Sequence, residues 1–207
     1  MRKDQYVIKN AYRRPIIPNK IIHSKSVLHL DSEFHGLDNN GYPIISGITL
    51  TDPKICSIIL CNYSKIKQDA WGEYTKDLWF LIEDFDNVSE KVLNDYPLYR
   101  RIVEYKIDGL QNIEIQEKIQ LEFGIKHSIE YISSLWRNKI PKLIASGAED
   151  EFLDWYYREV KPGKYKKCSR CGEIKLAHNK YYSLNKTSKD YFYSICKKCR
   201  NKRAKKS

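Results

Sequence analysis

Between residues 51 and 93, hydrophobic positions recur at the spacing of an α-helix. Thr51 and Asp52 precede Pro53, and a capping residue followed by proline at the first helical position is typical of a helix start. Apolar residues three or four apart share one face of a helix, so the pattern predicts two consecutive helices. Their apolar positions are Ile55, Ile58, Ile59 and Leu60 in the first helix and Leu78, Leu81, Ile82 and Phe85 in the second.

The chain before this region lacks such a pattern. Residues 31–51 contain the turn sequences Asp-Asn-Asn-Gly and Ser-Gly, which predict a loop with at most short strands. Residues 1–30 carry prolines at positions 15 and 18, which disfavour a regular helix. We therefore expect a basic N-terminal arm over residues 1–30 and a helical N-terminal region over residues 31–93.

The segment 94–160 predicts a helix-turn-helix domain. Gly109 ends a first helix, Asn112 caps a second, and Gly124 fits the left-handed residue that ends the second helix. Ser128 then caps a third helix, and Pro141 begins a further one. The inward apolar positions of the three helices are Leu98, Ile102, Tyr105, Ile115, Ile119, Phe123, Ile129, Ile132, Leu135 and Trp136.

In such a motif the third helix enters the major groove of DNA, where its outward side chains contact bases and phosphates. Arg137 and Asn138 suit bidentate contacts to guanine and adenine edges, whereas Glu130 opposes phosphate but can accept from a cytosine amino group. The alternative is a plain three-helix bundle with a solvated polar face. The candidate DNA-binding residues here are Lys126, Ser128, Tyr131, Ser134, Arg137, Asn138 and Lys139.

Residues 109–144 resemble the helix-turn-helix of sigma-factor region 4 and of related phage and bacterial regulators. The shared pattern is a turn glycine, a polar cap, Glu-Ile in the second helix, Gly-Ile at the turn and a serine before a spaced aliphatic helix. The second helix, which ends in QEKIQLEFG, is longer than in that family. The resemblance implies sequence-specific DNA binding by the third helix.

Charge is segregated along the chain. The formal net charge is +6 over residues 1–26, −9 over residues 27–160 and +14 over residues 161–207. Basic ends of this kind often contact a polyanion, and nucleic acid is the first candidate, although lysine-rich tails can also serve solubility alone. The candidate phosphate contacts at the C-terminal end are Lys197, Lys198, Arg200 and Arg203.

Two Cys-x-x-Cys pairs indicate a metal site near the C-terminus. Cys168 and Cys171 form the first pair, Cys196 and Cys199 form the second, and 24 residues separate them. Each pair can occupy two corners of a tetrahedral metal, and two pairs complete the coordination. The segment 161–207 is too short for a large hydrophobic core, so a structural zinc ion would supply much of its folding free energy.

A β-hairpin is predicted between the two pairs, with its turn at NKTSKD, and a helix is predicted to begin at the second pair. This layout resembles a treble-clef zinc finger of the type found in recombination endonuclease VII and HNH nucleases. Those nucleases place an Asp-His pair before the second cysteine pair, but the corresponding stretch here, NKTSKDYFYSI, contains no histidine. His178 stands alone near the first strand, so the resemblance implies the four zinc ligands without the catalysis.

Together these features predict a mainly α protein: a helical bundle with a helix-turn-helix over residues 94–160, and a small α+β treble-clef finger over residues 161–207. The apolar stretch at residues 55–61 is far shorter than the ~18 residues of a membrane helix. The first residues also lack the pattern of a secretory signal, so we expect a protein of the cytoplasm, that of a bacterial host if phage-encoded.

The leading functional interpretation is a phage-type transcriptional regulator that binds double-stranded DNA and is not an enzyme. One alternative is a small-terminase-like packaging protein, which implies a homo-oligomeric ring and a large terminase as partner. A second is a nuclease of the endonuclease VII type with a degenerate site. A third is an adaptor whose finger binds RNA polymerase.

Overall fold

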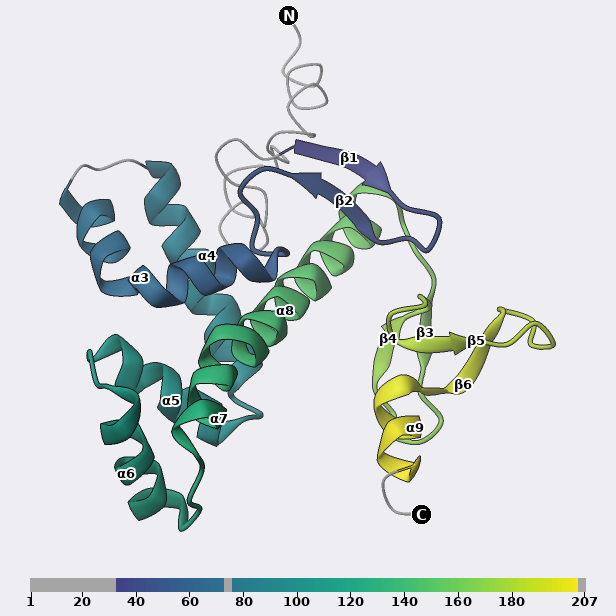
Figure 1. Ribbon diagram of the computed structural model, residues 1–207. Coiled ribbons are helices and arrows are strands. Elements are labelled where there is room, and N and C mark those ends of the chain that lie inside the picture. The colour runs from purple at the N-terminus through teal and green to yellow at the C-terminus, as the bar shows by residue number, and fades with distance from the viewer. Residues whose placement is uncertain (1–32, 73–75, 205–207) are drawn as a thin grey trace, which may run out of the picture. The chain divides into compact units, whose positions relative to one another are not determined.

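The computed structural model describes residues 33–72 and 76–204, so the arm predicted over residues 1–30 lies outside the described residues. Contacts divide the chain into two units (Figure 1). The helical unit comprises Ile45–Phe152 together with the start of the first strand. The finger unit comprises Gly36–Ile44 and the chain from Leu153 onward.

The helical unit begins with α3 (Pro53–Gly72) and α4 (Lys76–Leu93), which confirms the two helices predicted there. Asp52 caps α3, because its carboxylate accepts a hydrogen bond from the backbone N–H of Lys54 at 2.8 Å. The two helices pack against each other through predicted core positions. The buried members are Ile59, Leu60, Leu81, Ile82 and Phe85.

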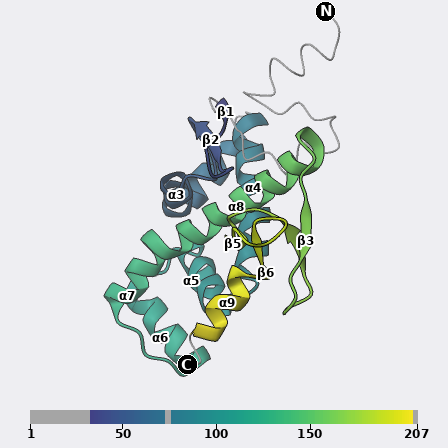
Figure 2. The same cartoon turned by 90° about the vertical axis from the view of Figure 1, so that its right-hand side faces the viewer.

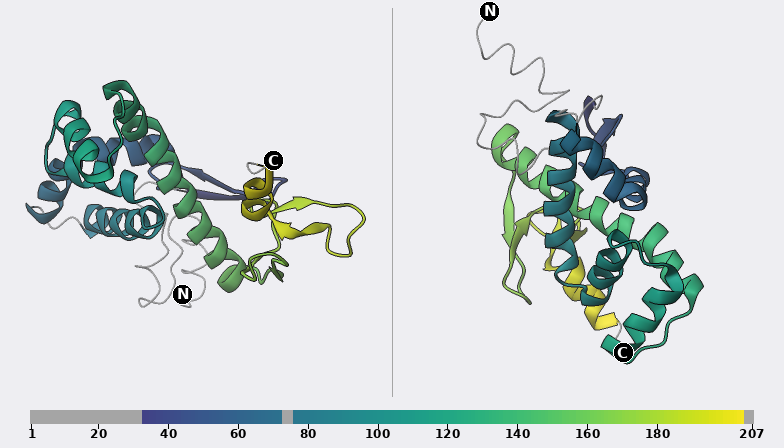
Figure 3. Two further views of the ribbon diagram at one scale, coloured as in Figure 1. Left: turned by 90° about the horizontal axis from the view of Figure 1, so that it is seen from below. Right: turned by 90° about the vertical axis from the view of Figure 1, so that its left-hand side faces the viewer.

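Three further helices follow as predicted: α5 (Pro97–Ile107), α6 (Asn112–Phe123) and α7 (Ile129–Ser134). In space α6 contacts both of its neighbours (Figure 3). The prediction that Asn112 caps α6 is wrong, since Gln111 is the cap and its backbone N–H donates to the Glu114 carboxylate at 2.6 Å. Gly124 ends α6 with φ 66°, as predicted.

A single helical rod continues from α7 through a π-helical turn, η1 (Leu135–Lys139), into α8 (Ile140–Trp155) (Figures 1, 2 and 3). The expectation that Pro141 begins a new helix is therefore wrong. Proline offers no N–H to the carbonyl of Arg137 four residues earlier. Ser57 of α3 supplies a replacement, because its hydroxyl donates to that carbonyl at 3.4 Å.

The rod also packs closely against α4. Gly147 permits this approach, since a Cβ atom there would lie 2.2 Å from Cγ2 of Val92. Ile144, Ala148 and Phe152 are fully buried along the same helix. Among the described helices, none has both the length and the apolar content needed to cross a bilayer.

The finger unit consists of short elements. A π-helical turn, η2 (Tyr156–Val160), precedes β3 (Tyr165–Lys167), β4 (Ile174–Leu176), β5 (Tyr182–Leu184), β6 (Phe192–Cys196) and α9 (Lys197–Ala204). β3 pairs with β4, and β5 pairs with β6, each in antiparallel fashion. The β5–β6 hairpin and α9 were predicted, whereas β3 and β4 around the first cysteine pair were not.

A further hairpin, β1 (Glu33–Leu37) and β2 (Pro43–Ser46), supplies its tip to the finger unit. The Asp38 carboxylate accepts hydrogen bonds from the backbone N–H groups of Asn40 and Tyr42, both at 2.8 Å. The turn sequence Asp-Asn-Asn-Gly therefore closes the hairpin by side-chain-to-backbone bonding.

Asp84 on α4 is an acidic side chain within the helical core, with only 7% of its surface exposed. Burial raises the pKa of its carboxyl group to about 8, and the negative charges of Glu83 and Glu151 act in the same direction. The folded protein therefore retains a proton on Asp84 at neutral pH that the unfolded chain loses.

We predict that Asp84→Asn makes the stability of the helical unit less dependent on pH. A carboxyl group whose pKa is raised in the folded state contributes fully to the free energy of unfolding below its ordinary pKa of 3.8. It loses this contribution as the pH rises towards about 8. The wild-type free energy of unfolding should thus fall relative to the variant by at most about 1.4 kcal/mol per pH unit in that window. Urea unfolding at pH 5 and pH 8 measures it, and parallel pH profiles would contradict the prediction.

Candidate functional site

The four cysteines of the two Cys-x-x-Cys pairs lie together in the finger unit. Cys168 follows β3, Cys171 lies in the turn before β4, Cys196 ends β6 and Cys199 lies on α9. Their sulfur atoms all lie within 4.8 Å of one another. The cluster can therefore hold a metal ion, as the sequence indicated.

Backbone geometry shapes the first half of this site. Gly172 has φ 75°, and its N–H donates to the Cys168 carbonyl at 2.9 Å, which closes the turn. Arg170 links the two halves, because its guanidinium donates to the Cys199 carbonyl at 2.8 Å. Tyr182, fully buried, packs beside Cys196 in the small core around the cluster.

The cluster fits a tetrahedral thiophilic ion. Metal–sulfur bonds of about 2.3 Å place tetrahedral sulfurs about 3.8 Å apart, a spacing that fits this cluster. The Cys168 sulfur accepts backbone N–H groups from Cys196 at 3.3 Å and from Arg170 at 3.5 Å. Burial alone would raise the pKa of the Cys168 thiol, but backbone N–H groups lower it to about 6 and so favour the metal-binding thiolate.

His178 has a packing role within the finger unit. The residue is 6% exposed, and its ring lies 5.1 Å from the ring of Tyr42 and 6.0 Å from that of Tyr157, measured between centroids. Gly41, at the tip of the β1–β2 hairpin, approaches so closely that a Cβ atom there would lie 2.5 Å from its Nε2. Sequence reasoning missed this contact, and the only local signal was the glycine of the turn.

The rod presents a polar face in the helical unit. Ser128 caps the start of the rod, as predicted, since its hydroxyl accepts a hydrogen bond from the backbone N–H of Tyr131 at 3.1 Å. Ile132, Leu135 and Trp136 are buried as expected, but Ile129 is 37% exposed and lines an open groove, so its predicted inward position is wrong. We call Glu130, Ser134, Arg137 and Asn138, which are all exposed, the polar face.

Two grooves flank the polar face, and Arg137 and Asn138 line both. The α6 groove, of about 420 Å³, is lined by Asn112, Ile129, Glu130, Ser133, Ser134, Arg137 and Asn138. The α3 groove, of about 360 Å³, is lined by Pro53, Lys54, Ser57, Ile58, Arg137, Asn138, Pro141 and Lys142.

The other candidate residues of this region lie beside the polar face. Lys126 is exposed in the turn before α7. The Tyr131 ring stacks on His127 with centroids 4.5 Å apart. The ammonium group of Lys139 lies 5.2 Å from the ring centroid of Tyr99 on α5, and a hydrogen bond with Tyr99 raises its pKa.

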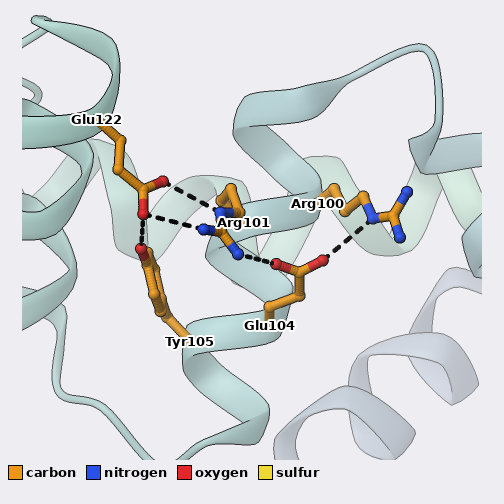
Figure 4. A network of polar contacts seen from close by, with 5 residues as sticks. All are labelled: Arg100, Arg101, Glu104, Tyr105 and Glu122. Atoms are coloured by element: carbon orange, nitrogen blue, oxygen red, sulfur yellow. Dashed lines mark hydrogen bonds and ion pairs between the residues drawn. The ribbon is translucent and has the colours of Figure 1, made fainter.

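A polar network joins α5 to α6 and supports this arrangement (Figure 4). Arg101 donates to Glu104 at 2.7 Å and to Glu122 on α6 at 3.1 Å. The Tyr105 hydroxyl also donates to Glu122, and Arg100 donates to Glu104 at 3.1 Å. Hydrogen bonds from Arg101 lower the pKa of Glu104, so the network keeps this carboxylate charged and holds the two helices together.

The basic candidates of the finger unit lie on α9. Lys198 and Arg200 are exposed, and Lys197 donates to the Asn179 side chain at 3.4 Å. The Arg200 guanidinium lies 4.4 Å from the ring centroid of Tyr193. The side chain of Arg203 lies outside the described part of the chain.

Comparisons of the chain with protein-family models, with curated proteins and with solved structures found no match.

We predict that Cys196→Ser removes the metal and unfolds the finger unit while the helical unit stays folded, because the helical unit has its own buried core. The exposed Cys61 provides a matched control, and Cys61→Ser should leave the metal content unchanged. Metal analysis of each purified protein, together with circular dichroism, tests this.

The wild-type chain should hold close to one zinc ion, with affinity falling as the pH is lowered and the thiolates protonate. The prediction would be contradicted if wild-type protein purified without chelators contained no stoichiometric metal.

Proposed function

We propose that this protein binds double-stranded DNA, with α5, α6 and α7 acting as a helix-turn-helix and the finger unit as a zinc-stabilised basic module. The observation that carries the proposal is the polar face. A helix whose opposite side is buried presents Arg137 and Asn138 to solvent beside Glu130 and Ser134.

The local geometry suits a rigid DNA-reading helix. The turn between α6 and α7 is fixed at both ends, by Gly124 at the end of α6 and by the Ser128 cap of α7. Within it, the Gln116 side chain of α6 donates to the His127 carbonyl. A helix held in this way can place Arg137 against guanine and Asn138 against adenine in the major groove.

The finger unit would contribute affinity without sequence preference. Its strands, hairpin and helix around four cysteines match the order of a treble-clef finger, and zinc is the ion that such a thiolate set selects. Residues 161–207 carry a net charge of +14, so Lys197, Lys198, Arg200 and Arg203 would neutralise phosphates.

Within this proposal the role is that of a transcriptional regulator, because a fixed helix bearing Arg and Asn serves discrimination between sequences. Selection of bound fragments from a random DNA library tests it with full-length, zinc-loaded protein. Enrichment of a common motif supports sequence-specific binding, which regulation and packaging-site recognition both require, and binding without enrichment contradicts it.

We predict that Arg137→Ala weakens binding to the enriched sequence by about 1–3 kcal/mol and leaves binding to random DNA nearly unchanged, because it removes a base contact. Arg137→Lys, which keeps the charge but removes the planar fork, should abolish most of the same specificity. Fluorescence anisotropy with both duplexes measures the two affinities.

We expect a different pattern when the basic residues of α9 are replaced by alanine. The replaced residues are Lys197, Lys198, Arg200 and Arg203. Binding to both duplexes should weaken alike, and the slope of log affinity against log salt should flatten by about 0.9 for each phosphate that the variant no longer neutralises. Equal weakening on both duplexes for Arg137→Ala would remove the base-reading role from the polar face.

A further inference from the structure

The α3 groove differs in charge from the α6 groove on the other side of the polar face. Its lining includes three cations, Lys54, Arg137 and Lys142, and no carboxylate. The lining of the α6 groove includes the carboxylate of Glu130 and a single cation, Arg137. A polyanion beside the polar face is therefore attracted to the α3 side.

The α3 groove also has an apolar component. Pro53, Ile58 and Pro141 contribute to its lining, and Ile58 is 55% exposed. A cationic rim above apolar surface matches a sugar–phosphate strand, in which charged oxygens alternate with deoxyribose rings. The nearby Asp52 carboxylate is used in capping α3, where it accepts the backbone N–H of Lys54.

A contact between α3 and the rod lies beside this groove. The hydroxyl of Ser57 donates to the Arg137 carbonyl at 3.4 Å, so α3 meets the rod where the polar face ends. Lys54 is one helical turn before Ser57, and Lys142 is one turn after Asn138. Both lysines are exposed.

We propose that the α3 groove binds one sugar–phosphate strand of duplex DNA, with Lys54 and Lys142 as phosphate contacts, while the polar face reads the adjoining major groove. The inference rests on the proposed function. It adds α3, an element outside the three-helix motif, to the DNA interface. It also specifies which side of the rod contacts the sugar–phosphate backbone of the DNA.

The test is the salt dependence of DNA binding by full-length, zinc-loaded protein carrying Lys54→Ala and Lys142→Ala. Removing two phosphate-binding cations should flatten the slope of log affinity against log salt by about 1.8 and lower the affinity at 0.1 M salt by roughly tenfold or more. The effect should be the same for the enriched duplex and for a random one. Arginine at both positions keeps the charges and should restore the slope.

A matched control replaces Lys65 on α3 and Lys91 on α4, which are exposed lysines of the helical unit outside both grooves and outside the three-helix motif. If the groove variant binds like this control, the proposal is overturned while DNA binding itself stands. A weakening confined to the enriched duplex would also overturn it, because the lysines would then contact bases. If the wild-type chain binds neither duplex, the proposed function fails together with the groove.

Discussion

The polar face and its two grooves lie where one continuous helix passes a proline. Pro141 cannot donate to the carbonyl of Arg137, which leaves this carbonyl without its usual helical partner. The rod widens into the π-turn Leu135–Lys139 just before the proline, and the Ser57 hydroxyl donates to the free carbonyl. This hydrogen bond links α3 to the rod beside the α3 groove. Arg137 and Asn138 line both this groove and the α6 groove.

The spacing of apolar residues was sufficient to predict the helices, and the two Cys-x-x-Cys pairs were sufficient to predict the metal cluster. Predictions from local sequence were wrong at positions whose structure depends on contacts with distant segments. Pro141 was expected to start a helix, since nothing in the local sequence reveals that Ser57, on a distant helix, satisfies the carbonyl that the proline leaves free. Ile129 has the spacing of a core residue, yet it faces an open groove. The cap of α6 lies one residue earlier than predicted for a local reason, since the backbone N–H of Gln111 donates to the Glu114 carboxylate.

The two units reach stability by different means. The helical unit buries large apolar side chains along α3, α4, α5 and the rod, so its fold follows from hydrophobic burial. The finger unit is built around three cysteines and Tyr182, in a segment with a net charge of +14. A metal ion held by the four cysteines would add folding free energy to so small and so highly charged a segment. The tip Gly36–Ile44 adds packing to this unit through Tyr42 and His178, a contribution invisible in the spacing of the cysteines.

The distribution of charge constrains how DNA binding can proceed under the proposed function. Residues 45–152, the main part of the helical unit, have a formal net charge of −5, so at a distance this part of the unit repels DNA. Screening reduces this repulsion beyond about 10 Å at 0.1 M salt, and the basic finger can hold a duplex nearby by phosphate contacts alone. At contact, the cations of the α3 groove would offset part of this repulsion on any sequence. Base contacts by the polar face would add binding free energy only on a matching sequence, so they would set the preference among sequences.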